Sequence, residues 1–436
     1  MRGRNIWTVM ALLVGLTGAG LPGFGAPGLP GLGLIGVARA EGLDGTVIMG
    51  YQGWFGCPDD PESLGRWGHW MREQPNNQPP RASVDMLPDV SGMPEAARCD
   101  TPLRDAQGKV IQVFSQLRPA TLDTHFAWMQ RYGIGAAMVA RFAIGIGTPP
   151  FAATDRTLRL ALDAAELHGR HAFVSYDLTD LSQDKVDAVV EDLRRLRAEG
   201  LLDRPGWQRH RGKPVIDIFG LGTPGIHFDA AHARALLEGL RATGPLTVMG
   251  GVGAGWRTLG AASRKEPEWA AIYRSLDIIR PWPVGAFTDD AGADRFLRDY
   301  VIPDLAETRR LGIGYMPVAM PGFSAMNLKT LAGNHGPVNQ IPRRCGDFYW
   351  HQVRSLLGAG VTMLQAGQFD EADEGTAMMP FRADVPADAR GQPLFLSRDA
   401  DGCALPADWY LRLAQETARA LRSGHVPGPM PQPTER

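Results

Sequence analysis

Residues 136–177, AAMVARFAIGIGTPPFAATDRTLRLALDAAELHGRHAFVSYD, contain two short apolar runs separated by an amphipathic helical pattern. The runs at 136–142 and 171–177 are too short for a typical helix. They show little alternation of polar and apolar residues, as strands buried on both faces do. Residues 154–169 repeat apolar side chains at helical spacing, begin with Thr-Asp and end with Gly. The stretch therefore predicts a parallel β-α-β unit.

The same alternation continues in both directions along the chain. Further apolar runs lie at 46–51, 214–220, 246–251, 277–282, 314–320 and 361–367. Further helical patterns lie at 121–133, 183–200, 228–244, 293–312 and 348–360. Eight strands alternating with helices predict an α/β fold, a (β/α)8 TIM barrel that forms one domain over residues 41–424. An open doubly wound sheet is the alternative.

One long segment, residues 52–120, interrupts this rhythm between the first strand and its helix. It is rich in Pro, Asp, Trp and Arg and has no strong helical pattern. A loop at this position is expected at the C-terminal mouth of a barrel, where active sites occur. Cys57 and Cys99 both lie in it, so they are the favoured disulfide pair among four cysteines that allow three connectivities.

The two ends of the chain are expected to lie outside the fold. Residues 1–40 have a basic start, an apolar run at 6–16 and a small-x-small site at 38–40, which together predict a signal peptide and export to the periplasm or the extracellular space. An uncleaved membrane anchor is the alternative. The Pro-rich tail, residues 425–436, is predicted to be disordered.

The charge balance narrows the possible partners. Without the three arginines of residues 1–40, the chain has 42 basic and 47 acidic residues and no basic block. Nucleic acid is therefore not expected as a partner, nor is a stable membrane association after signal cleavage. The cysteine spacings match no zinc pattern, so no metal and no cofactor are predicted.

Residues just after the barrel strands form a chemically distinctive set of aromatic, acidic and amide side chains. In a barrel these residues meet at one mouth. Aromatic faces can stack on sugar rings, and carboxylates and amides can bind hydroxyls. The predicted substrate-binding residues are Tyr51, Gln52, Trp54, Arg141, Asp177, Trp256, Trp282, Phe323 and Asp370.

Four carboxylates follow the last strand within five positions, namely Asp370, Glu371, Asp373 and Glu374. Glu371 and Glu374 are three residues apart, so a helical turn would place them on one face with Cβ atoms roughly 5–6 Å apart. Cleavage of a glycosidic bond needs such a pair, one group to protonate the leaving oxygen and one as base or nucleophile. Crowding of like charges keeps one acid protonated. The alternative is a solvated acidic loop.

The string Phe-Asp-Glu-Ala-Asp-Glu-Gly-Thr at 369–376 resembles Phe-Asn-Glu-Trp-His-Glu-Gly-Thr, the signature of glycoside hydrolase family 99, the endo-α-mannosidases. It is still more similar to the family 71/99-like proteins, some of which are labelled xylosidase/arabinosidase. The likeness extends over roughly residues 46–415. Further similar segments are 50–55, 87–90, 125–129, 176–178, 321–324 and 341–350.

The resemblance implies a retaining hydrolase on a (β/α)8 barrel that acts on an oligo- or polysaccharide. Glu371 would take the proton of the sugar 2-hydroxyl, whose oxygen forms a 1,2-anhydro sugar. Glu374 would serve as general acid and then as base. Departures from the family 99 string at Asp370, Ala372 and Asp373 leave the sugar and the endo-action open. A non-catalytic carbohydrate-binding barrel and an inverting hydrolase are the alternatives.

Overall fold

The computed structural model describes residues 42–334, 336–386 and 395–433. The predicted signal peptide, residues 1–40, lies outside this part of the chain. Within it, no helix is both long enough and apolar enough to cross a membrane.

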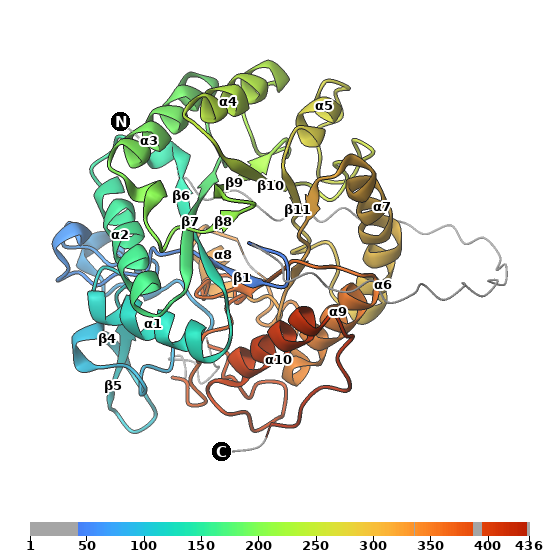
Figure 1. Ribbon diagram of the computed structural model, residues 1–436. Helices are drawn as coiled ribbons and strands as arrows, with labels where there is room; N and C mark the ends of the chain where they lie inside the picture. Colours follow the sequence, from blue (N-terminus) through green and yellow to red (C-terminus); the bar gives the residue numbers. More distant parts are fainter. Residues whose placement is uncertain (1–41, 335, 387–394, 434–436) are drawn as a thin grey trace.

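A curled parallel sheet forms the centre of the molecule (Figure 1). Along the sheet the strands follow the order β12-β11-β10-β9-β7-β6-β1-β14-β13, and the short β8 (Arg209–His210) pairs antiparallel with β9. The strands are β1 (Val47–Tyr51), β6 (Ala136–Phe142), β7 (His171–Asp177), β9 (Lys213–Leu221), β10 (Thr247–Val252), β11 (Ile278–Pro281), β12 (Gly314–Tyr315), β13 (Val318–Ala319) and β14 (Leu364–Gln368).

The predicted strand at 314–320 is split into β12 and β13 by Pro317, which has no backbone N–H to donate. β12 pairs with β11 at one end of the sheet, and β13 pairs with β14 at the other end. The two end strands are thus separated along the chain only by residues 316–317. Met316 N donates to Ile279 O at 2.9 Å, and Gln365 N donates to Pro317 O at 3.0 Å. This arrangement is compatible with the predicted (β/α)8 barrel.

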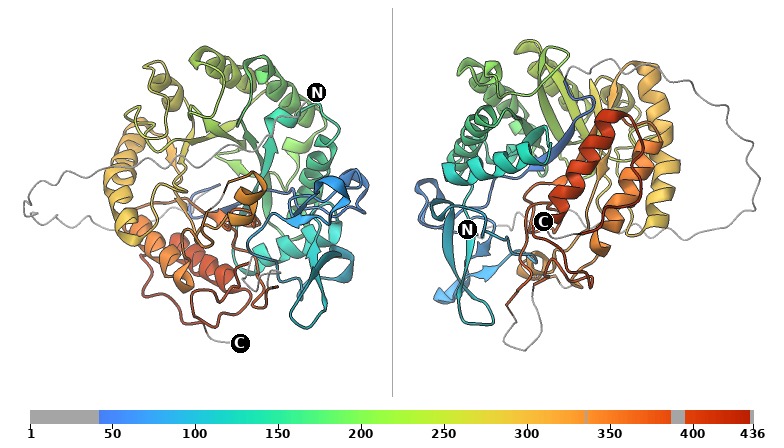
Figure 2. Two further views of the ribbon diagram at one scale, coloured as in Figure 1. Left: turned by 180° about the vertical axis from the view of Figure 1, so that it is seen from behind. Right: turned by 60° about the horizontal axis from the view of Figure 1, so that its bottom comes forward.

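Helices surround the curled sheet (Figures 1 and 2). Two of them begin at an aspartate whose side chain caps the helix: Asp229 accepts from His232 N at the start of α4 (Ala230–Ala242), and Asp289 accepts from Gly292 N at the start of α6 (Asp290–Phe296). The main helices are α1 (Pro119–Arg131), α2 (Phe151–Leu167), α3 (Val186–Ala198), α4 (Ala230–Ala242), α5 (Trp269–Arg274), α6 (Asp290–Phe296), α7 (Ile302–Leu311), α9 (Asp347–Gly358) and α10 (Trp409–Ser423).

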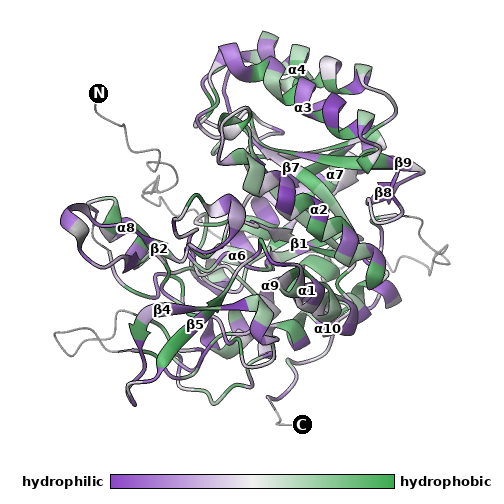
Figure 3. Cartoon of the chain, turned by 90° about the vertical axis from the view of Figure 1, so that its left-hand side faces the viewer, coloured by the Kyte–Doolittle hydropathy of each residue, from purple (hydrophilic) through white to green (hydrophobic). Residues whose placement is uncertain are grey.

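The long segment 52–120 contains two small hairpins, β2 (Met71–Arg72) with β3 (Arg81–Ala82) and β4 (Arg98–Arg104) with β5 (Val110–Phe114). The disulfide between Cys57 and Cys99 fastens this segment, which confirms the favoured pairing, and Cys345 bonds to Cys403. In Figure 3, β2, β4 and α8 (Met326–Leu331) lie at the end of the molecule opposite β8, which pairs with the start of β9.

The chain after α10 does not leave the molecule at once. Trp350 Nε1 donates to the carbonyl oxygen of Gly428 at 3.0 Å, and Met430 packs against the main hydrophobic core. The described part of the tail thus contacts the folded chain at Gly428 and Met430.

Candidate active site

The four carboxylates lie on a tight turn directly after β14. Thr376 N donates to Glu371 O and Gly375 N donates to Ala372 O, both at 3.2 Å. Gly375 has φ +63°, and a Cβ at this position would come within 2.8 Å of Ser324 N, so the turn requires glycine. Glu371 and Glu374 therefore lie on one compact turn of the backbone.

Glu371 is almost fully buried, with 6% of its surface exposed. Its Oε2 accepts a hydrogen bond from Gln52 Nε2 at 2.8 Å and one from Thr376 Oγ1 at 3.4 Å. Burial raises the pKa of Glu371 well above its usual value, and the negative charges of Glu374 and Asp373 raise it further.

Glu374 is half-buried on the same turn, and its carbonyl oxygen accepts from Ser324 N at 2.9 Å. Burial, with the charges of Asp373 and Asp177, raises the pKa of Glu374 to about 7, and Lys329 opposes this rise. The carboxyl group pair therefore holds at least one proton near neutral pH. One protonated and one ionised carboxyl group is the state that acid–base catalysis requires.

Asp370 joins the chain after β14 to the chain after β1. Its carboxylate accepts from the backbone amides of Gln52 at 2.8 Å and Gly53 at 2.9 Å, and from Gln116 Nε2 at 2.5 Å. Burial raises the pKa of Asp370 to about 6, against the effect of these donors. Asp370 is fully buried, and its hydrogen bonds hold the carboxylate turn against the chain after β1.

Asp373 contacts a histidine that sequence reasoning missed. His69 Nδ1 lies 2.8 Å from Asp373 Oδ2, and the His69 ring stacks on Trp54 with centroids 3.8 Å apart and planes 8° from parallel. Phe142 also stacks on Trp54, at 5.3 Å. The indole of Trp54 thus packs on protein rings. His69 lies in the irregular segment 52–120 with no local pattern to mark it.

Gln52, Asp177 and Phe323 lie at or beside this turn. Gln52 bonds to Glu371, the charge of Asp177 acts on Glu374, and Phe323 directly precedes Ser324. Burial raises the pKa of Asp177 to about 6. Trp282, at the end of β11, is partly exposed and packs edge-on against Phe219, whose register partner is Asp177.

Three other predicted residues do not lie among these side chains. Tyr51 is buried beneath the turn and its hydroxyl bonds to His125 Nδ1 at 2.9 Å. Arg141 is fully buried and pairs with Asp192 of α3 at 2.8 Å. Trp256 is also fully buried, and its Nε1 donates to Asp304 of α7 at 2.8 Å. Arg141 and Trp256 thus bond to carboxylates of the helix layer.

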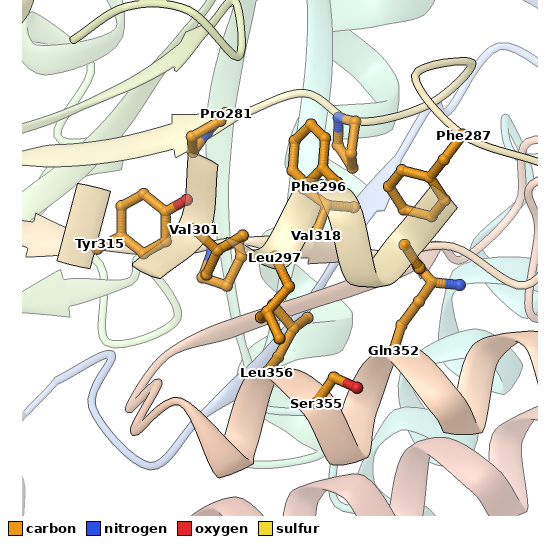
Figure 4. Close-up of a pocket in the computed structure, with 13 residues that line it drawn as sticks. Pro281, Phe287, Phe296, Leu297, Val301, Tyr315, Val318, Gln352, Ser355 and Leu356 are labelled. Atoms are coloured by element: carbon orange, nitrogen blue, oxygen red, sulfur yellow. The ribbon is translucent and has the colours of Figure 1, made fainter. Parts of the chain in front are cut away.

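An apolar pocket lies away from this turn, between β11, the split strand and helices α6 and α9 (Figure 4). Phe296, Val318 and Leu356 line it, and none of its described lining residues belongs to the turn 369–376. Among the described residues, no group of three or more His, Cys, Asp or Glu side chains is arranged to hold a metal ion. The carboxylate turn, with its buried acidic side chains and raised pKa values, is the candidate active site.

No known family model matches this sequence, and no curated protein matches it either. Solved structures do match. Two structures of the GH99 endo-α-mannosidase from Bacteroides thetaiotaomicron, one in complex with bis-tris propane, give TM-scores of 0.60 and 0.62 at 15% sequence identity. The chain shares the fold of this mannosidase.

In both comparisons the matched part covers 88% of this chain, and it covers 99% and 98% of the two mannosidase chains. The resemblance noted at residues 369–376 is thus confirmed at the level of the fold. Both matched structures are glycoside hydrolases of the barrel type that the sequence predicts.

Proposed function

We propose that the protein is an exported glycoside hydrolase that cleaves a glycan with retention of configuration, and that Glu371 and Glu374 are its catalytic pair. The observation that carries this proposal is the turn that the two glutamates share. On it, the buried Glu371 bonds to Gln52 and lies three positions before the half-buried Glu374, whose pKa is raised. The shared family 99 fold supports it.

The surroundings of the two glutamates support a division of roles. Burial raises the pKa of Glu371 well above its usual value, and the side-chain N–H of Gln52 opposes this rise by favouring the ionised form, which a base requires. Glu374 is more accessible, and its raised pKa keeps a proton available near neutral pH, which suits a general acid. The closeness of Asp177 to Glu374 gives the site a further group that can bind a sugar hydroxyl.

In the proposed first step, Glu371 accepts the proton of the sugar 2-hydroxyl, and the 2-oxygen attacks the anomeric carbon. The bond to the leaving oxygen breaks as Glu374 gives that oxygen its proton. In the second step, Glu374 takes a proton from water, whose oxygen opens the 1,2-anhydro sugar at the anomeric carbon. Glu371 then returns its proton to the 2-oxygen. Both glutamates regain their starting states, and two inversions give net retention.

Other residues fit the proposal as binding groups. We assign Gln52, Trp282 and Phe323 to the sugar-binding surface, together with Asp177. The segment 52–120 would form the mouth of the barrel, since its residues Gln52, His69 and Asp85 bond to the turn or to Ser324 beside it.

The leaving group provides the test. Glu374→Gln should lose more activity on natural glycosides than on activated aryl glycosides, because good leaving groups need no proton. Glu371→Gln should impair both, each by about 10²–10⁴-fold. A 2-deoxy substrate should bind and stay intact. Its rapid turnover would exclude the anhydro-sugar route and make Glu371 a direct nucleophile.

Two outcomes would indicate the alternatives. If wild type and both variants bind the same glycan without hydrolysis, the protein is a carbohydrate-binding barrel. If the first product, followed by NMR, has the opposite anomeric configuration, the enzyme is inverting.

A further inference from the structure

Asp373 lies between the two glutamates in sequence, directly before Glu374, and its side chain is nearly fully buried. Its Oδ2 lies 2.8 Å from Nδ1 of His69, which belongs to the segment after β1. We propose that Asp373 and His69 form a positioning pair, in which His69 holds a negative charge on Asp373 beside Glu374 and this charge retains the proton of the general acid. This inference rests on the proposed function.

His69 is fixed in the orientation that the pair requires. Its ring lies nearly parallel to Trp54 at 3.8 Å, its backbone N donates to Trp54 O at 3.3 Å, and Ser83 Oγ donates to its carbonyl oxygen. Burial and the nearby Arg72 lower the pKa of His69 well below its usual value. The imidazole is thus neutral, and in the tautomer with its N–H on Nδ1 it donates to the ionised carboxylate of Asp373.

The charges around Asp373 come from several elements. Glu371, Glu374 and Asp370 lie on its own turn, while Arg72 and His69 come from the segment 52–120. Asp177 of β7 and Lys329 of α8 act on Glu374 from the other side. Burial raises the pKa of Asp373 itself to about 7, and the charge of Arg72 opposes this rise. In its ionised form Asp373 opposes loss of the proton from Glu374, and it is among the groups that raise the pKa of both glutamates.

The pair also gives a physical account of one departure from the family string. The family 99 signature has His where this chain has Asp373, and here a histidine from a distant segment faces that position. His and Asp are thus both present at this place, but on two different parts of the chain.

Asp373→Asn tests the charge without changing the shape, because Asn Oδ1 can still accept from His69. We expect the alkaline limb of the pH–kcat/KM profile to move to lower pH by about one unit, since the general acid loses its proton more easily. The matched control is Asp294→Asn, which alters an exposed pair with His351 (2.7 Å) and should leave the limb in place. A lower rate at every pH with an unmoved limb would overturn the proposal.

Two variants of His69 separate its hydrogen bond from its stacking. His69→Asn keeps an N–H donor near Asp373 but loses the ring, and His69→Phe keeps a ring on Trp54 but loses the donor. The phenylalanine variant should shift the alkaline limb to lower pH as Asp373→Asn does, while the asparagine variant should retain the wild-type limb. The opposite result would assign the role to stacking.

A readout without substrate keeps this inference separate from the proposed function. The midpoint of urea unfolding, measured from pH 4 to 8, should fall less with rising pH in Asp373→Asn than in wild type, because one buried ionisable group is gone and another ionises more easily. Identical pH dependence in the two proteins would contradict the pair. Absence of hydrolysis on every glycan would contradict only the proposed function.

Discussion

Asp85 Oδ2 lies 2.5 Å from Ser324 Oγ, although the two residues are 239 positions apart. The same carboxylate accepts from the backbone amides of Met326 and Asn327 at 2.7 Å, so Asp85 caps α8 from another part of the chain. Ser324 N in turn donates to the carbonyl oxygen of Glu374. The segment 52–120 is thereby connected to the proposed general acid.

Asp85→Ala should therefore weaken both the fold and the site. Loss of three hydrogen bonds to a fully buried carboxylate should reduce the free energy of unfolding by about 1–3 kcal/mol and lower kcat. Urea unfolding and steady-state kinetics measure the two effects. Asp187→Ala, at an exposed position of α3, is the control and should stay within about 0.5 kcal/mol of wild type. Equal stability of the two variants would contradict the role of Asp85.

Gly375→Ala should disrupt the carboxylate turn. Alanine at φ +63° is disfavoured by about 1–2 kcal/mol, and its Cβ would collide with the backbone at Ser324. Gly402→Ala is a matched control, because Gly402 has φ +86° and no described atom within 4 Å of the added Cβ. Thermal unfolding should show a larger loss for Gly375→Ala, together with lost activity. Similar losses in both variants would mean that the backbone near Ser324 can move to relieve the collision at little cost in free energy.

The buried carboxyl groups predict that stability falls as the pH rises. Burial raises the pKa of Asp177, Asp304 and Asp370 to about 6 and that of Asp373 and Glu374 to about 7. The same groups in an unfolded chain have pKa values of about 4. The native state therefore binds more protons in between, so this stabilisation is complete below about pH 4 and is lost as the pH rises to about 7.

Glu374→Gln should remove part of that loss, because a neutral amide carries no buried charge at any pH. We expect a higher Tm than wild type at pH 8 and a smaller difference at pH 5, measured by thermal unfolding in buffers of equal ionic strength. A Tm difference that does not change between the two pH values would show that ionisation of Glu374 does not destabilise the native state.

Arg141→Ala should destabilise the protein without a specific effect on catalysis. Arg141 is buried between Asp192 and Asp155, and removing it leaves the buried Asp192 with fewer partners, at a cost of about 3–5 kcal/mol. The folded fraction should keep wild-type KM. A raised KM with unchanged stability would instead return Arg141 to the substrate-binding surface that the sequence suggested.

The sequence predicted the strands well, because strands buried on both faces appear as short apolar runs whose ends are sharp. Runs 136–142 and 171–177 match β6 and β7 residue for residue. Pro317 was visible inside the run 314–320, but its effect on pairing depends on the neighbouring strands. Helix α10 was missed, although its buried residues Trp409, Leu413 and Thr417 follow helical spacing.

The site was predictable only where it is local. Glu371 and Glu374 are part of one short string, whereas His69 and Asp85 bond to residues 304 and 239 positions away. In a strand buried on both faces, the apolar pattern also does not indicate on which face of the sheet each side chain lies. The position of Arg141 at the end of its strand, and of Trp256 after its strand, did not show that both side chains bond to carboxylates of helices.

In the sheet, β1 lies between β6 and β14, so the first strand to leave the ribosome has a neighbour on one side that is made last. At about 5–20 residues per second, roughly 15–60 s of synthesis separate the two strands. Until then β1 has an unpaired edge, and open edges invite association between chains. A nascent chain held apart from its neighbours until the C-terminal part is complete would avoid this, so yield should depend on chaperone supply during synthesis.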